Sequence, residues 1–153
     1  MTMPIKLYHN IRGFLCHKNE LEIILRIYEY PGFVALTETF LDGSVQCPSI
    51  PGYIEIGRRD RGGLRQKGGV IMFVREDLVK YVVHLSNSEN HERIWAVIHS
   101  DQGPILFGVW YRPASYGEIE SIHSLRVELE QHGKTKLGIV LCGDMNVHFI
   151  GWL

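Results

Sequence analysis

Three short runs of consecutive apolar residues constrain the fold of this 153-residue chain most strongly. They lie at residues 33–36, 70–74 and 137–142, each bounded by glycine or polar residues. Runs of this length are typical of β-strands covered on both faces. They are far too short to span a bilayer, so we expect no membrane partner. With 45% hydrophobic and 22% charged residues, the whole chain, residues 1–153, is expected to form one domain.

Helical periodicity between these runs predicts an alternating order of strands and helices. Asn19 and Glu22 have the spacing of a capping box. The apolar residues that follow recur on one helix face, and the predicted helix ends before Pro31. Further strands are expected at residues 95–98 and 105–110, joined by a hairpin turn. The fold class predicted from this order is mixed α/β.

A second helix is predicted between the strands at 105–110 and 137–142. Ser115 and Glu118 form a second capping box, and Gly133 is placed to end the helix. Four apolar residues recur at helical spacing and are expected to point into the core. These residues are Ile119, Ile122, Leu125 and Leu129.

Polar residues that directly follow the predicted strands are the candidates for chemistry, because active sites of α/β folds lie at strand ends. They are Glu38 after the first run, Tyr111 after residues 105–110, and Asp144 with Asn146 after the last run. Alone, a Gly-Asp-x-Asn sequence is often only a turn. Together, a carboxylate that binds Mg²⁺ and groups that orient water and a phosphate oxygen are what phosphate-ester hydrolysis requires.

Five basic residues gather in one glycine-rich segment, although the formal net charge of the chain is only −1. Such a segment is as often a solvated loop as a binding surface. If the substrate is DNA, contacts to backbone phosphates are the better interpretation, and they would weaken with salt. The candidate DNA-binding residues are Arg58, Arg59, Arg61, Arg65 and Lys67, joined by Arg112 after Tyr111.

The order of these residues resembles the endonuclease/exonuclease/phosphatase superfamily, and most closely the apurinic-like endonuclease domains of non-LTR retroelements. The resemblance runs through nearly the whole chain. The matching stretches are HNIRG at residues 9–13, LTET at 36–39, KGGV at 67–70, VWYRP at 109–113 and GDMNVH at 143–148.

The resemblance implies a role for each site residue. Glu38 is similar to the main ligand of Mg²⁺, with Mn²⁺ as an alternative, and Asn10 to its neighbour in the metal site. Tyr111 resembles the tyrosine that hydrogen-bonds the scissile phosphate. Asp144 resembles the residue that positions the water or assists the leaving group, and Asn146 one that contacts phosphate. The implied reaction nicks one DNA strand and leaves a 3′ hydroxyl that could prime a reverse transcriptase encoded downstream.

The resemblance also implies a two-sheet sandwich flanked by helices, the DNase I-like four-layer architecture, lacking its last strands. Family members continue into strands that carry another catalytic aspartate and a Ser-Asp-His segment, whereas this sequence stops at Leu153. Family members have both the loop that contains His148 and the Ser-Asp-His segment, so His148 does not replace the histidine of that segment. Loss of a general base lowers a rate by roughly a hundred- to ten-thousandfold, so reduced or absent activity is expected.

Two alternatives to the nuclease remain open from the sequence. One is a non-catalytic retroelement remnant or DNA-binding module, and the other is a superfamily phosphatase or lipid phosphodiesterase. The arginine-rich segment favours the nuclease over the second alternative. Three scattered cysteines are typical of reduced thiols inside a cell, and an enzyme acting on chromosomal DNA is expected in the nucleus.

Overall fold

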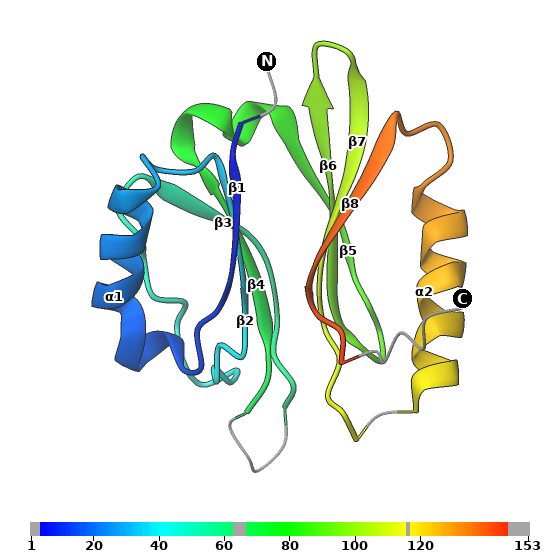
Figure 1. The fold of residues 1–153 in the computed structure, drawn as a ribbon, viewed down its shortest axis with the longest axis horizontal. Coiled ribbons are helices and arrows are strands. Elements are labelled where there is room, and N and C mark those ends of the chain that lie inside the picture. The colour runs from blue at the N-terminus through cyan, green and yellow to red at the C-terminus, as the bar shows by residue number, and fades with distance from the viewer. Residues whose placement is uncertain (1–3, 63–66, 116, 147–153) are drawn as a thin grey trace, which may run out of the picture.

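Two four-stranded sheets lie between two helices in the computed structural model, which describes residues 4–62, 67–115 and 117–146 (Figure 1). Sheet A has the strand order β1-β2-β4-β3, and sheet B has the order β5-β6-β7-β8. The strands are β1 Lys6–Asn10, β2 Phe33–Thr37, β3 Tyr53–Arg59, β4 Val70–Arg75, β5 Val82–Asn87, β6 Glu92–Ser100, β7 Gly103–Tyr111 and β8 Gly138–Asp144. The helices are α1 Phe14–Ile27, the 3-10 helix η1 Glu76–Tyr81 and α2 Glu118–His132.

The inner faces of the two sheets form one apolar core. Phe33 of β2 meets Phe107 of β7 with ring centroids 5.8 Å apart. A second core lies between sheet A and α1, where Phe14 packs edge-on against Phe73 at a centroid distance of 5.8 Å. Strand β2 is buried on both faces, as its apolar run predicts. The layers therefore confirm the predicted two-sheet sandwich flanked by helices (Figure 1).

Helix α1 begins earlier than the sequence predicts. Its first residue is Phe14, and Asn19 lies inside the helix rather than at its cap. The reason is tertiary: the backbone N–H groups of Gly13 and Phe14 donate to the carbonyl oxygens of Glu38 and Thr39 over 2.8 and 2.9 Å. These bonds satisfy N–H groups at the start of the helix that otherwise need a capping side chain.

Helix α2 differs from its prediction in both its start and its buried face. It begins at Glu118 after Gly117, without a side-chain cap from Ser115. Ile119 and Ile122 are 84% and 47% exposed, so the prediction that they point inward was wrong. Polar partners on sheet B decide the orientation: Arg93 and Trp95 of β6 both donate to Glu128 of α2, and His132 hydrogen-bonds Ser86 of β5. The predicted end at Gly133 is confirmed.

The described helices include none with the length and apolarity needed to cross a membrane.

Candidate functional site at the ends of four strands

The predicted site residues meet where two parallel strand pairs end. In sheet A, β1 runs parallel to β2, with Asn10 beside Thr37. In sheet B, β7 runs parallel to β8, with Tyr111 beside Asp144. Parallel strands bring their carboxyl ends to one edge of a sheet, and the packing of the two sheets brings both edges together. The structure thus places residues from four strands at one end of the sandwich (Figure 1).

A hydrogen bond joins the two halves of the site. The Tyr111 hydroxyl of sheet B donates to Glu38 Oε1, which follows sheet A, over 2.7 Å. Burial raises the pKa of Tyr111 to about 12, the bond to Glu38 adds to this effect, and Arg61 opposes it. The phenol therefore keeps its proton at neutral pH and remains a hydrogen-bond donor. The second carboxylate oxygen of Glu38 lies 3.8 Å from Arg12 Nε, so it keeps a long ion pair at the rim.

Asn10 provides the observation that best fits a bound cation. Its Oδ1 atom is buried and has no hydrogen-bond partner among the described residues. Buried acceptors are almost always paired, with protein, water or an ion. Asn10 lies at the end of β1, beside the strand that leads into Glu38. An amide oxygen near a carboxylate fits Mg²⁺ or Mn²⁺, which take oxygen ligands and complete their shells with water and phosphate.

The described residues hold no group of three or more histidine, cysteine or acidic side chains that could form an all-protein metal cage. A cation at Glu38 and Asn10 would instead be completed by water and substrate oxygens. That is the usual arrangement for Mg²⁺, which is bound through one or two carboxylates together with phosphate.

The loop after β8 is shaped by backbone geometry. Gly143 has φ +142°, and a Cβ there would collide with the Trp110 backbone. Asn146 has φ +44°, and its backbone N–H donates to Asp144 Oδ1 over 3.3 Å, as in an Asx turn. The side-chain amide of Asn146 donates to the Arg112 carbonyl over 2.7 Å. Asp144 and Asn146 are thus held beside Tyr111 in a locally tied turn.

Arg112 supports this turn from inside the protein. It is 3% exposed, and its Nε donates to the Met145 carbonyl over 2.6 Å. Its Nη2 also bonds the Asn146 carbonyl, and its backbone N–H donates to the Asp144 carbonyl over 2.8 Å. The structure therefore gives Arg112 a role in shaping the loop, and its contact with DNA stays a prediction. His148 lies outside the described residues.

The other predicted DNA-binding residues fall into different environments. Arg58 pairs with Asp60 over 2.8 Å and donates to two backbone carbonyls of the 42–45 segment. Arg59 donates to backbone carbonyls of the segment at residues 88–89. Lys67 is exposed, and Arg65 lies outside the described residues. Their predicted contacts with phosphate remain untested.

Arg61 lies beside Tyr111 at the site. Its Nε donates to Glu92 Oε2 over 3.1 Å, and its guanidinium carbon lies 5.5 Å from the centroid of the Tyr111 ring. Glu92 is buried and was missed from the sequence, where it is one of two acidic residues near the start of β6 and no pattern distinguishes it from Glu89.

Tyr8 was also missed. Its hydroxyl pairs with Thr37 Oγ1 over 3.0 Å. Burial raises the pKa of Tyr8, the bond to Thr37 opposes this, and nearby Asp144 and Glu38 raise it further. The phenol thus lies among the site carboxylates. Its position two residues before Asn10, on the same side of β1, was the available signal.

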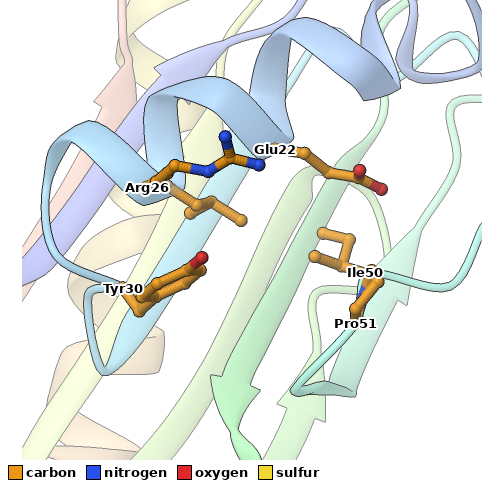
Figure 2. Close-up of a pocket in the computed structure, with 6 residues that line it drawn as sticks. Glu22, Arg26, Tyr30, Ile50 and Pro51 are labelled. Atoms are coloured by element: carbon orange, nitrogen blue, oxygen red, sulfur yellow. The ribbon is translucent and has the colours of Figure 1, made fainter.

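Two surface hollows lie at different distances from this site. One, between α1 and the segment after β2, is lined by Glu22, Leu25, Arg26, Tyr30, Ile50 and Pro51 (Figure 2). It contains none of the predicted site residues. The other is lined by Arg12 and Gly13, the first turn of α1, and Thr39 with Phe40. Its lining includes Arg12, which pairs with Glu38, and Thr39, which follows Glu38 in the chain.

Comparison with known proteins agrees with this geometry. The family described as "Endonuclease/Exonuclease/phosphatase family" matches residues 7–152. No curated protein matches the chain in sequence.

Among solved structures, similar ones include the endonuclease domain of TRAS1, a telomere-specific non-LTR retrotransposon, with a TM-score of 0.68 and 16% identity. That match covers 95% of this chain and 62% of the other. The AP endonuclease LMAP of Leishmania major has a TM-score of 0.67 at 16% identity, over 93% of this chain and 55% of that one. The human Nocturnin catalytic domain has a TM-score of 0.57 at 12% identity, over 97% of this chain and 67% of that one. These likenesses concern the fold, and the chain spans less than two thirds of the first relative.

Proposed function

Because the chain belongs to the endonuclease/exonuclease/phosphatase family, we propose that it hydrolyses phosphodiester bonds in DNA with a bound divalent cation. The observation that carries the proposal is the buried Oδ1 of Asn10, which has no hydrogen-bond partner among the described residues and lies at the end of the strand that pairs with the one leading into Glu38. Glu38 in turn accepts the Tyr111 hydroxyl. A buried acceptor of this kind, near a carboxylate, is suited to a cation. A phenol that keeps its proton is suited to a phosphate oxygen.

Each side chain has a defined part in the proposed reaction. Glu38 and Asn10 hold the cation, which when bound stabilises the negative charge that develops on the phosphate. When substrate binds, Tyr111 turns its one hydroxyl proton from Glu38 to a non-bridging phosphate oxygen. The Asn146 side-chain amide keeps one N–H on the Arg112 carbonyl and donates the other to a second phosphate oxygen. Asp144 orients the attacking water and accepts hydrogen bonds from it. The tied turn after β8 keeps Asp144 in place for this task.

Nicking of one strand in the manner of a retroelement endonuclease is the finer part of the proposal. It is supported by the order of the matching stretches and by the fold similarity to the TRAS1 endonuclease domain. The 3′ hydroxyl left by the nick would serve a reverse transcriptase encoded downstream. The site of action would then be the nucleus, where chromosomal DNA lies.

A plasmid-nicking assay tests the proposal. The protein is incubated with supercoiled plasmid and Mg²⁺ or Mn²⁺, with and without chelator. Glu38→Gln and Asp144→Asn are compared with Glu130→Gln, an exposed residue on α2. We expect the first two changes to lower the nicking rate by roughly a hundredfold or more and the third to leave it unchanged. Nicking that survives the chelator or Glu38→Gln would contradict the proposal.

Cation binding can be measured apart from turnover. Mg²⁺ titration followed by amide chemical shifts should move the signals of Asn10 and Glu38 in the unaltered protein, and Glu38→Gln should weaken this response. A protein that binds Mg²⁺ at these residues and binds DNA without nicking it would be the non-catalytic module considered from the sequence.

A further inference from the structure

The sequence points to the glycine pair Gly68-Gly69, but the proposed function assigns it no role. Both glycines have positive φ values, +70° and +89°. A Cβ on Gly68 would lie well inside the van der Waals radii of Glu92 Oε1 and the Arg61 guanidinium, and one on Gly69 would collide with Thr39 Oγ1. The pair is therefore needed for the backbone to approach the Glu92 carboxylate.

Glu92 is a buried carboxylate with both oxygens committed. It is 3% exposed, and it lies directly opposite Tyr111 in the antiparallel pairing of β6 with β7. Oε1 accepts the Gly69 backbone N–H, and Oε2 accepts the Arg61 Nε–H over 3.1 Å. A buried carboxylate is costly unless it is paired in this way. The glycine pair and Arg61 together satisfy it.

Arg61 connects this buried group to the site. Its guanidinium lies over the Tyr111 ring, 5.5 Å from the centroid, and Tyr111 donates to Glu38. A cation held over an aromatic face restricts both the ring and the cation. A continuous series of contacts thus runs from the Gly69 backbone through Glu92 and Arg61 to the phenol and the candidate metal ligand.

We infer that Glu92 and Arg61 are positioning residues for Tyr111, holding its ring where the hydroxyl donates to Glu38 in the free protein and to the phosphate in the complex. This inference rests on the proposed phosphodiester cleavage for its consequence, but the positioning itself is a property of the free protein. It assigns Arg61 a task different from the phosphate contact predicted from the sequence. The two tasks have different kinetic signatures, because phosphate contact strengthens substrate binding, whereas positioning acts on the chemical step.

The kinetic test compares Arg61→Met and Glu92→Gln with Arg75→Met. Arg75 also pairs with a carboxylate, Asp77, but lies at the far end of β4. For the nicking of an intact oligonucleotide duplex, we expect kcat to fall about tenfold in the first two variants while KM stays within about twofold of the unaltered protein. Arg75→Met should change neither constant. A rise in KM at unchanged kcat would overturn the inference in favour of a phosphate contact.

A spectroscopic test does not need activity. The ring signals of Tyr111 in tyrosine-labelled protein are assigned through Tyr111→Phe. They should move in both Arg61→Met and Glu92→Gln and stay in place in Arg75→Met. Ring signals that stay in place in Arg61→Met would overturn the inference even if the protein nicks DNA. Absent nicking with moved signals would refute the proposed function and uphold the positioning. Because the Arg61 side chain is 26% exposed, Arg61→Met is expected to fold. If Glu92→Gln does not fold, the result for Arg61→Met decides the test.

Discussion

Glu128→Ala is expected to destabilise the protein far more than a surface glutamate change on the same helix. Among the described residues, Glu128 is the acidic partner of Arg93, with Arg93 Nη1 2.7 Å from Glu128 Oε2. The Arg93 side chain is 0% exposed and lies over the Trp110 ring at 4.2 Å. The same glutamate oxygen accepts the Trp95 indole N–H over 2.8 Å. Its removal leaves a buried guanidinium without a counter-ion and an indole donor without an acceptor.

The magnitude follows from burial. Breaking a buried ion pair by removing one partner costs about 3–5 kcal/mol, whereas an exposed pair contributes about 0–1 kcal/mol. Glu130 is the matched control, because it pairs with Arg126 over 3.0 Å and both side chains are largely exposed. A loss of 3–5 kcal/mol is a large part of the roughly 5–15 kcal/mol by which domains are stable.

The free energy of unfolding of Glu128→Ala and of Glu130→Ala is measured by urea unfolding, followed by tryptophan fluorescence and by far-UV circular dichroism. We expect Glu128→Ala to lower the free energy of unfolding by about 3 kcal/mol or more, and Glu130→Ala by less than about 1 kcal/mol. Adding Arg93→Met to Glu128→Ala should recover part of the loss, since the stranded charge is then gone. Equal effects of the two alanine changes would refute the reasoning that α2 is held by this buried pair.

Three other outcomes follow from the structure. Although burial acts the other way, hydrogen bonds from Ser88, Trp95 and Arg93 keep the pKa of Glu128 below its ordinary value of 4.5. The stability that the Glu128 carboxylate contributes is therefore present above pH 4.5 and is lost as the pH falls through its pKa in the folded protein. In urea unfolding, the difference in the free energy of unfolding between the unaltered protein and Glu128→Gln should therefore become smaller in acid. Burial raises the pKa of Cys142 to about 12, so a disulfide reagent at pH 8 should label exposed Cys16 first and Cys142 only on unfolding, as mass spectrometry would show. Gly143→Ala should lower the free energy of unfolding by about 1–3 kcal/mol in the same urea assay, and an unchanged value would contradict the strain assigned to its backbone.

Local patterns predicted β2, β4, β6, β7 and β8 but not β1, β3 or β5, and they predicted the strand ends at which the candidate site lies. The apolar runs at residues 33–36 and 70–74 became β2 and β4, because a strand buried on both faces carries its signal in consecutive residues. Glu38 and Asp144 could be placed for the same reason, since each directly follows such a run. Strand β1 was missed because Leu7 is the one aliphatic residue of Lys6–Asn10, so the stretch shows neither an apolar run nor a regular alternation.

Features that depend on partners distant in sequence could not be predicted in this way. The face of α2 is set by Arg93 and Trp95, which lie on a strand that no local pattern of the helix reveals. Arg112 was predicted only as a contact to DNA, and no local pattern shows that the carbonyl oxygens of the turn after β8 enclose it. The role of Glu92 depends on the glycine pair and on Arg61, which approach it only in the folded chain.

The candidate site is divided between the two sheets, which are joined there by side-chain bonds such as that from Tyr111 to Glu38. The spacing of the groups that would act on a phosphate is consequently set by the thickness of the apolar layer, where Phe33 meets Phe107. A misplacement of about 1 Å can cost a reaction roughly a hundredfold in rate. Core volume is thus a means of adjusting the chemistry: a Phe107→Leu change that the fold tolerates could retune cleavage without altering a single polar residue.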